Sequence, residues 1–439
     1  MTTRVAGVAI GVLALSVSLR AQIPHTEQAS ATASSVDPIG GLSLDDAIAQ
    51  ALQNEPGLQA LRARVDVTRG LREQAGLRPN PSVSFFQQQE PAGTDRQTRL
   101  ELQWPLDLFR KAGRTAVADR EIEMAQETAA DRERTLAGDV RMKYGEVAAA
   151  VRMLSVTEQL LAATTRQRGL VASQVDEGAT PPIDRDMLRV EERRLEADRM
   201  LQAGAADRRL IELKRLLGMP VDAPLTLRES LEGLVQRDAR PSSDPSSAAT
   251  ARPDVREAEA RVRTSEAEID RAHREGRADV SLVGAYMRMD AGFPQQGLSP
   301  GGEFQRIRGV FHYVSAGAMV TLPVLNHNQG GVAAAEADRR GAVARLEATR
   351  LAAQNEIGVA RSREEHARRA LEAYSGEAIA LATQNLSVVR QTYQLGRGTL
   401  LDVLNEQRRY LDLERTYTDV LREAYEARQD LETALGGVR

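Results

Sequence analysis

The stretch YQLGRGTLLDVLNEQRRYLDLERTYTDVLREAYEARQDLETALG, residues 393–436, decides the fold of this 439-residue chain. Gly396 and Gly398 predict a tight turn, because glycine adopts positive φ without a steric cost. Apolar residues then recur at spacings of three and four, on one face of a helix: Leu413, Tyr417, Val420, Ala424, Ala427 and Leu431. Gly436 stands where a C-terminal cap glycine would stand. The stretch therefore predicts a turn followed by one long helix.

The same pattern occurs once more, earlier in the chain. The interval from Gly178 to Gly218 spans 40 residues, as does the interval from Gly396 to Gly436. Prolines agree with this register, since Pro105 and Pro323 each precede the turn glycine of their own half by 73 residues. The chain thus duplicates one order: helix, strand, strand, very long helix, glycine turn, helix.

The duplication predicts the domain organisation. We expect two repeats, residues 42–218 and 253–437, joined by an equatorial segment and linker at 219–252. An apolar run ending near Leu19 has the length of a signal-peptide core, so residues 1–21 are predicted to be an export signal. Residues 22–41 are rich in Ser, Thr and Ala and are predicted to be disordered.

Composition restricts the class of protein. Aromatic residues make up only 3% of the chain, which suits long Ala-rich helices better than a thick globular core. The net charge of −4 gives no electrostatic support for a nucleic-acid partner. With no cysteine, the chain has neither disulfides nor thiolate metal sites.

Two hairpins are predicted, at 82–106 and 279–323. Their strands are expected at residues 82–90, 97–106, 279–287 and 315–323. Alternation at period two gives each hairpin an apolar face, which is expected to contact lipid through Leu100, Leu102, Trp104, Val320 and Leu322. The Gly- and Pro-rich segment 288–312 is predicted to be a surface loop outside the cell.

Four strands are too few for a closed barrel from one chain, and an open sheet edge is not allowed in lipid. The strands are therefore either soluble hairpins packed on a helix or barrel strands pooled from several chains. The stretches 108–177 and 327–395 lack strong helix breakers and predict two very long coiled-coil helices, each returning at its glycine turn.

Catalytic chemistry is not indicated. The sequence holds no nucleophile elbow, phosphate-binding loop or zinc-protease motif, and its five histidines lack metal-ligand spacing. Pairs of carboxylates lie on the polar faces of the predicted helices, where exposure to solvent explains them without a catalytic role. We expect no enzyme activity, no cofactor and no metal site.

The chain resembles the TolC-type outer-membrane efflux channels, over residues 42–437. The resemblance is carried by LSLDDAIAQALQNEP (42–56), by WPLDLFRKAGR (104–114) and LPVLNHNQGGVAAAEA (322–337) after the second strand of each hairpin, and by YQLGRGTLLDVLNEQ (393–407). The LPVLNHNQG segment is most similar to the branch that serves cation efflux pumps.

The resemblance implies a mainly α fold with a small β part. It implies a homotrimer whose strands form a 12-stranded barrel in the outer membrane of a Gram-negative bacterium, continued by an α-helical tunnel in the periplasm. The implied function is a passive duct of a tripartite efflux system, with metal cations as one candidate cargo. Its partners would be membrane lipid, a periplasmic adaptor and an inner-membrane pump of the resistance-nodulation-division class.

Two sites follow at the tips of the helical hairpins. In the family, Tyr and Asp positions tie neighbouring hairpins together, which implies a periplasmic gate formed by Asp184, Tyr393, Arg397, Asp402 and Asn405, through a Tyr393–Asp184 or an Arg397–Asp184 contact. The alternative role for Asp184 and Asp402 is to favour a helix N-terminus. The turns are expected to dock the adaptor, through Gly178, Thr180, Gly396, Gly398 and Thr399.

Two other functions remain open from the sequence. The chain could be a soluble periplasmic coiled-coil adaptor or scaffold, or the outer channel of a type I protein secretion system. An adaptor leaves the alternating strand 97–106 without a purpose, which favours the efflux duct.

Overall fold

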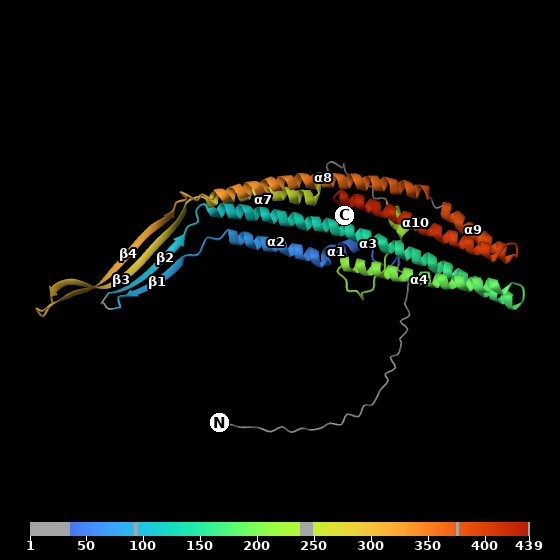
Figure 1. Cartoon of the computed structure of the whole chain (residues 1–439), viewed down its shortest axis with the longest axis horizontal. Coiled ribbons are helices and arrows are strands. Elements are labelled where there is room, and N and C mark those ends of the chain that lie inside the picture. The colour runs from blue at the N-terminus through green and yellow to red at the C-terminus, as the bar shows by residue number, and fades with distance from the viewer. Residues whose placement is uncertain (1–35, 92–94, 238–248, 375–376, 438–439) are drawn as a thin grey trace, which may run out of the picture.

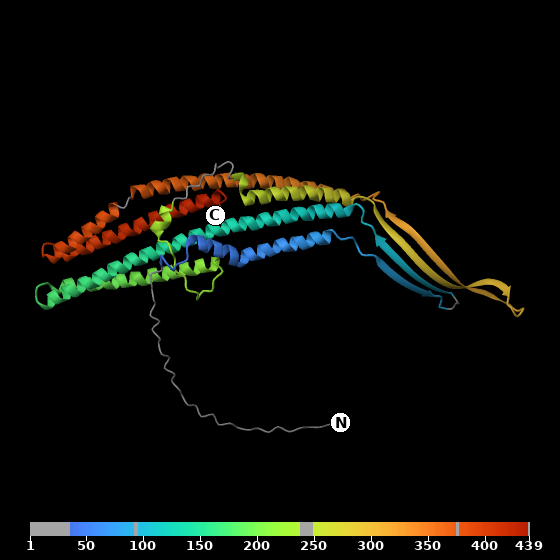
Figure 2. The same ribbon diagram turned by 180° about the vertical axis from the view of Figure 1, so that it is seen from behind.

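The computed structural model of the chain describes residues 36–91, 95–237, 249–374 and 377–437. The predicted signal 1–21 lies outside these residues. The molecule is long and gently bowed, with a sheet at one end and two helical tips at the other (Figure 1). The view from behind shows the same arrangement, with α3 and, on the other side, α8 followed by α9 running from the sheet towards the tips (Figure 2).

The N-terminal half follows the predicted order. Its elements are α1 (Leu44–Asn54), α2 (Pro56–Ala75), β1 (Ser82–Gln89), β2 (Arg96–Pro105), α3 (Arg110–Asp176) and α4 (Pro182–Leu216). Local chemistry sets several bounds. The Ser43 hydroxyl accepts from the Asp46 N–H at 3.2 Å and caps α1. Pro56 and Pro182 begin α2 and α4, where a missing N–H is tolerated.

The C-terminal half repeats this order with one difference. Its elements are α5 (Leu231–Gln236), α7 (Pro253–Glu275), β3 (Asp279–Leu298), β4 (Phe304–Thr321), α8 (Gln329–Ala373), α9 (Glu377–Gln394) and α10 (Leu400–Ala434). The prediction of one continuous helix over 327–395 is wrong, because α8 ends at Ala373 and α9 begins at Glu377. The intervening sequence contains Ser375 and Gly376, both poorer helix formers than alanine.

The four strands form one antiparallel sheet in chain order, β1-β2-β3-β4. The prediction of a loop over residues 288–312 is wrong, because β3 and β4 stay paired as far as Leu298 and Phe304 and leave only a short turn. The Gly- and Pro-rich composition of this segment is typical of a loop. In the structure the segment remains in the strands, whose register shifts between Gly292 and Gln296. An irregularity of this kind is where a strand accommodates proline and glycine.

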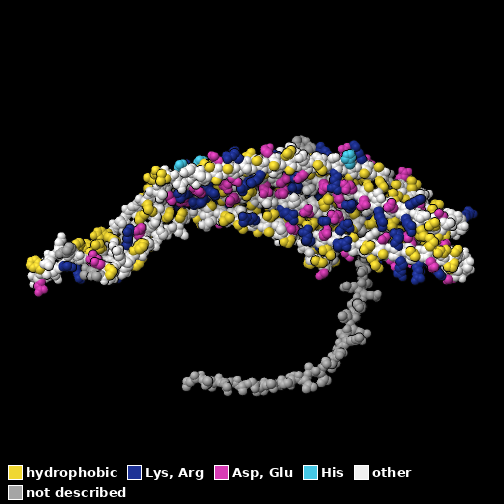
Figure 3. All heavy atoms as spheres, viewed as in Figure 1, with side chains coloured by type: hydrophobic (Ala, Val, Ile, Leu, Met, Phe, Trp, Pro, Cys, Tyr) yellow, Lys and Arg dark blue, Asp and Glu magenta, His cyan; other side chains and the backbone are white. Residues whose placement is uncertain are grey.

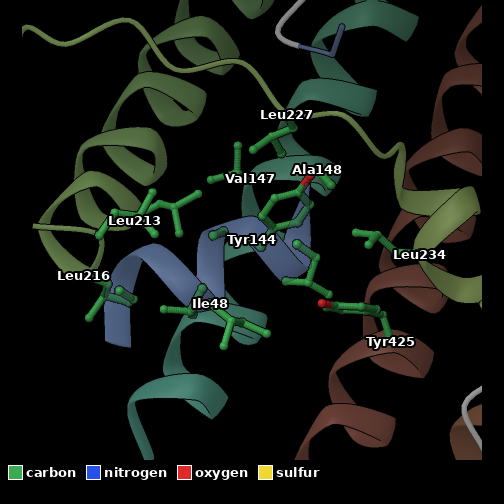
Figure 4. Packing of buried hydrophobic residues seen from close by; sticks show 14 of the residues in the cluster. Ile48, Tyr144, Val147, Ala148, Leu213, Leu216, Leu227, Leu234 and Tyr425 are labelled. Carbon is green, nitrogen blue, oxygen red and sulfur yellow. The ribbon is translucent and has the colours of Figure 1, made fainter. Parts of the chain in front are cut away.

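The largest apolar core lies midway along the molecule and joins α1, α3, α4, α5 and α10 (Figure 4). Tyr144 of α3 is at its centre; its hydroxyl donates to the Leu42 carbonyl at 2.8 Å. Gly145, next along α3, is required for close helix approach, because a Cβ there would fall on the ring of Tyr425 in α10. This core fixes the second half of the chain against the first.

The segments that flank the first half fold against this core. Leu227 is fully buried and forms isolated bridges with Val36 and Leu42. The predicted disorder of residues 22–41 is therefore wrong from residue 36 onward, because hydrogen bonds to the 226–227 backbone, including Asp37 N–H to Leu227 O at 2.7 Å, order this stretch.

Charge is distributed unevenly along the molecule. In the space-filling view, Lys, Arg, Asp and Glu of both signs are interspersed over the helical body and are sparser along the sheet (Figure 3). Arg363 shows the pattern on the helices. Its guanidinium lies 2.7 Å from Glu423 and 3.5 Å from Glu426 and also contacts Asp430, so one arginine of α8 pairs with three acids of α10. The sheet end thus presents a different surface from the helical end.

Candidate functional site: the helical tips and the strand face

The two helical tips have one backbone design. Gly178 and Gly396 have φ of +78° and +72°, a region that side chains avoid. Each helix before the turn closes with the equivalent bond. The Ala179 N–H donates to Gln174 O at 2.8 Å in the first half, and the Arg397 N–H donates to Thr392 O at 3.0 Å in the second. These are six-to-one closures of a helix end by glycine. The duplicated sequence therefore produces a duplicated turn.

The tips of the two hairpins touch through an apolar cluster, which we term the tip cluster. It consists of the buried residues Val171, Leu188, Leu400, Val403 and Leu404. Leu188 of α4 has no exposed surface, although it lies within three turns of the end of the hairpin. The tips are thus joined within one chain rather than splayed.

Two of the predicted gate residues meet beside this cluster. The Tyr393 hydroxyl, at the end of α9, donates to Asp184 Oδ2 in the first turn of α4 at 2.9 Å. Burial and the neighbouring Asp184 carboxylate raise the pKa of Tyr393 to about 12. The tyrosine is therefore neutral, and able to donate, throughout the physiological range.

The other predicted gate residues do not join this contact. Asp402 instead caps its own helix: Asp402 Oδ2 accepts from the Thr399 N–H at 3.1 Å and from the Thr399 hydroxyl at 2.6 Å. These bonds lower the pKa of Asp402. Arg397 and Asn405 are exposed, and within the described ranges neither makes a side-chain hydrogen bond or ion pair. Of the two predicted contacts to Asp184, the structure contains the one from Tyr393.

The predicted docking residues occupy the turns themselves. Gly178 and Gly396 are exposed at the ends of the molecule, and Gly398 is half-buried beside Thr392. Thr180 donates to Gln174 Oε1 at 3.4 Å, whereas Thr399 is the N-cap of α10.

A buried polar layer above the tip cluster was missed from the sequence. It consists of Thr164 and Gln167 on α3, Glu191 and Glu192 on α4, and Gln407 on α10. On all three helices it separates the tip cluster from the next apolar cluster, which contains Leu160, Leu195 and Leu411. Gln407 is only 1% exposed, yet neither end of its amide has a hydrogen-bond partner among the described residues. The sequence did contain a signal for this layer: polar residues occupy positions at which the spacing of three and four residues places the core of a helical bundle.

The predicted apolar strand residues share one face of the sheet. Directly opposed residues of antiparallel strands point to the same side. Leu102 is opposite Val83 and Gly284. The same register gives further apolar rows: Phe85, Leu100, Tyr286 and Val314; Trp104, Leu282 and Ala318; Val280 and Val320. Leu322 follows the end of β4 and is 66% exposed.

The apolar face ends at a polar row towards the tip of the hairpins. Thr98, Arg288 and His312 are aligned there. The Tyr286 hydroxyl lies 2.6 Å from His312 Nδ1, so this aromatic ring links the apolar rows to the polar row. The opposite face is mixed. It carries Ser84, Glu101 and Ser315 but also Phe86, Met287 and Tyr313, so it is more polar than the face of the apolar rows.

Among the described residues, no helix combines the length and the apolar character needed to cross a bilayer. The same residues contain no group of three or more His, Asp or Glu placed to hold a metal ion.

An amphipathic sheet continued by long helical hairpins is the architecture of a channel-type membrane protein. The chain belongs to the outer membrane efflux protein family, whose model matches residues 47–219 and 245–437. It is therefore an outer membrane efflux channel, with its helical part in the periplasm, as the sequence analysis predicted. The family consists of passive channels that work with an adaptor and an inner-membrane pump.

Two curated relatives are similar over most of the chain. Outer membrane protein OprJ of Pseudomonas aeruginosa is 28% identical, covering 87% of this chain and 79% of the relative. Cobalt-zinc-cadmium resistance protein CzcC of Cupriavidus metallidurans is 24% identical, covering 90% of each chain.

Solved structures share the fold. The outer-membrane channel OprN aligns with a TM-score of 0.69 at 21% identity, covering 90% of both chains. The CusC channel aligns with a TM-score of 0.70 at 20% identity, covering 90% of this chain and 92% of the other. The open-state MtrE channel of Neisseria gonorrhoeae gives the same TM-score at 19% identity, covering 90% and 89%.

Proposed function

We propose that three copies of this chain pool their sheets into one 12-stranded barrel and their helices into one tunnel. The two repeats, 42–218 and 253–437, would each supply one hairpin and one long helical pair. The observation that carries the proposal is the sheet itself. Within the described residues its outer strands β1 and β4 pair on one side only, while one face is apolar from the Val280–Val320 row to the row of Leu100 and Tyr286.

Physical chemistry requires partners for these edges. An unpaired strand edge in hydrocarbon leaves backbone N–H and C=O groups without hydrogen bonds, at a cost of several kcal/mol each. Joining β4 of one copy to β1 of the next removes every edge once the ring closes. Three copies give 12 strands, within the range of 8 to 26 seen for outer-membrane barrels. The apolar face, with Leu100, Leu102, Trp104 and Val320, would then lie against lipid.

Because the chain contains no cysteine, disulfides between introduced cysteines can test the pairing of β4 in one copy with β1 in the next without background. Ser84→Cys in β1 is combined in turn with Tyr313→Cys, Ser315→Cys or Gly317→Cys in β4, on the same polar face. Within one chain β1 and β4 are three strand spacings apart, about 14 Å, beyond the ~7 Å reach of a disulfide. A covalent trimer on a denaturing gel is expected for at least one pair, and Ser84→Cys alone is the control. Products that stop at the dimer would contradict the ring.

The tips are proposed to close the tunnel and to dock the adaptor. Support for closure comes from the Tyr393–Asp184 bond and the tip cluster, which hold the two hairpins together. Support for docking comes from the position of both turns at the end of the molecule away from the sheet (Figure 1). The pump is proposed to be of the resistance-nodulation-division class.

A second question is the cargo, for which we propose divalent metal cations. The support is the similarity, over 90% of each chain, to a cobalt-zinc-cadmium resistance protein and the carboxylates at both tips, Asp184 and Asp402. Deleting the gene is expected to lower the tolerated concentration of cobalt, zinc or cadmium several-fold while leaving tolerance to large drugs unchanged. The reverse outcome would assign the channel to drug efflux.

A further inference from the structure

A large hollow lies where the sheet meets the helical body. It has a volume of about 760 Å³ and is lined by the start of α3, the end of α7 and the segment that leads from β4 into α8. Asn328, at the end of that segment, donates through Nδ2 to the Ala272 carbonyl at 2.8 Å and fixes the segment against α7. The hollow is therefore a built feature of the junction.

Two arginines in this hollow have unused hydrogen-bond donors. Among the residues that the structure describes, Arg110 Nε is buried without a hydrogen-bond partner, and Arg110 Nη1 lies 3.4 Å from Asp279 Oδ2. Arg277 is exposed, with its guanidinium carbon 5.9 Å from the centre of the Phe109 ring, and the described residues give it no ion pair. An oxyanion at this place would satisfy donors from both.

The other charged groups around the hollow already have partners. Arg114 Nη2 lies 2.6 Å from Asp107 Oδ2. Glu275, the carboxylate on the end of α7, lies 3.5 Å from Arg271. The charge left without an ion pair among the described residues is thus positive and belongs to Arg277, while Arg110, paired with Asp279, still offers its unused Nε donor.

Beside these arginines the surface is apolar. Leu322, Val324 and Leu325 are 66%, 78% and 89% exposed, and Leu108, between β2 and α3, is 56% exposed. They directly follow the last apolar row of the sheet face, Val280 and Val320. Cationic groups bordering an exposed apolar surface match the two ends of a lipid molecule.

We propose that this hollow binds the phosphate headgroup of a phospholipid in the periplasmic leaflet of the outer membrane. Arg110 and Arg277 hold the phosphate, since the guanidinium fork suits phosphate oxygens. The acyl chains lie along Leu322 and the apolar face of β4. The periplasmic leaflet follows from the helices, which lie in the periplasm at this end of the sheet. The inference rests on the proposed barrel, which turns the apolar face towards lipid.

The test uses the full chain purified in detergent and dioctanoyl phosphatidylglycerol as the probe. Helix unfolding is followed by circular dichroism with the lipid, or with inorganic phosphate at the same concentration. A rise of several degrees in Tm is expected with the lipid and none with phosphate. The double variant Arg110→Gln/Arg277→Gln is expected to lose most of this rise. The matched control Arg340→Gln/Arg361→Gln, which removes the same charge from exposed positions on α8, is expected to keep it.

Two further variants keep the proposal open to refutation if the double variant does not fold. Arg277→Gln alone leaves the Arg110–Asp279 pair in place, and Leu322→Ser removes only the apolar contact; each is expected to reduce the lipid-induced rise. An unchanged rise in the arginine variants, or an equal rise with phosphate, would overturn the lipid site. Trimer content is measured in the same samples, so that missing trimer contradicts the barrel, whereas intact trimer without a lipid effect contradicts only this inference.

Discussion

Gln407 shows how a single side chain can set the stability of a helical bundle. Its amide is buried in the polar layer with both ends lacking a partner among the described residues. An unsatisfied buried polar group costs about 1–3 kcal/mol, and an apolar replacement of similar shape removes that cost. We therefore expect Gln407→Leu to increase the free energy of unfolding by up to about that amount, measured by denaturant unfolding of the purified channel.

The control is Gln394→Leu, an exposed glutamine at the end of α9, which is expected to change stability by less than about 0.5 kcal/mol. A loss of stability in Gln407→Leu would mean that a water molecule or another copy satisfies the amide. The polar layer would then be a specific contact of the assembled tunnel.

Tyr393 is the residue through which closure of the tips can be tested. Tyr393→Phe removes only the hydroxyl that donates to Asp184. We expect the variant, alone and combined with Arg397→Ser, to raise single-channel conductance in planar bilayers. Tyr374→Phe, at the end of α8, is the matched control and is expected to leave conductance unchanged. Equal conductance in all variants, with the trimer intact, would leave this contact a purely structural role.

The pH dependence of this contact follows from the direction of the shift. The pKa of Tyr393 is raised to about 12 in the folded protein, from an ordinary value of 10.0. The stabilisation is therefore complete below pH 10 and is lost as the pH rises through about 12. Any change in conductance between pH 6 and 9 must come from a group other than this tyrosine.

At the scale of elements, the strand face gives the most direct prediction. Leu102 and Gln103 are neighbours on β2 that point to opposite sides of the sheet. Arginine on the lipid side of a barrel costs about 2–4 kcal/mol near the bilayer midplane. Leu102→Arg is therefore expected to reduce assembled trimer in outer membranes, as measured on native gels, whereas Gln103→Arg assembles normally. Equal assembly of the two variants would reverse the assignment of the faces.

The long β3–β4 hairpin gives a second prediction at this scale. Its pairing continues to Leu298 and Phe304, whereas β2 leaves β3 at the Arg96–Asp290 pair. The hairpin thus projects beyond the rest of the sheet, at the end far from the helices. A protease site inserted at Gly301 is expected to be cut when the enzyme is added to intact cells. Cleavage that requires a broken outer membrane would place this end on the periplasmic side.

Which elements could be predicted from sequence depends on how local their causes are. The bounds of α1, α2 and α4 follow from Ser43, Pro56 and Pro182, which act within a turn. The separation of α8 from α9 also has a local cause in the sequence, since Ser375 and Gly376 are poor helix formers. The prediction missed it because it considered only strong helix breakers such as proline. The pairing of β3 with β4 beyond residue 288 could not be predicted from the local sequence, because hydrogen bonds between the two strands override the turn-like composition.

At the scale of the whole molecule, the duplication explains the likeness of the two tips. Equivalent glycines adopt the same φ region and place Thr180 and Thr399 on turns at one end. We expect photo-crosslinkers at Thr180 and Thr399 to capture the periplasmic adaptor in cells, as detected by mass spectrometry. A crosslinker at Ser299, in the hairpin turn at the opposite end, is the control. Capture from Ser299 alone would contradict docking at the tips.

The duplication also limits what could be foreseen of the site. It indicated that Asp184 and Asp402 occupy equivalent places, yet the structure gives them different partners. Asp184 accepts from Tyr393 across the two hairpins, whereas Asp402 bonds to Thr399 three residues away. The first half has Pro181 where the second has Thr399, so only one helix can form a capping box. Equivalent positions therefore carry different contacts where their neighbours differ.

The open edges of the sheet have a consequence for the life of each newly made chain. In the proposed barrel, β1 and β4 remain bare strand edges beside an apolar face until copies meet, a combination that recruits other strands and leads to aggregation. The helical body, by contrast, buries its own core around Tyr144 and needs no second copy to do so. Safe delivery therefore demands an order of events in which the helices fold first. If the proposed barrel forms, we expect a chaperone to keep the strands of each copy unpaired until the membrane and the other copies are within reach.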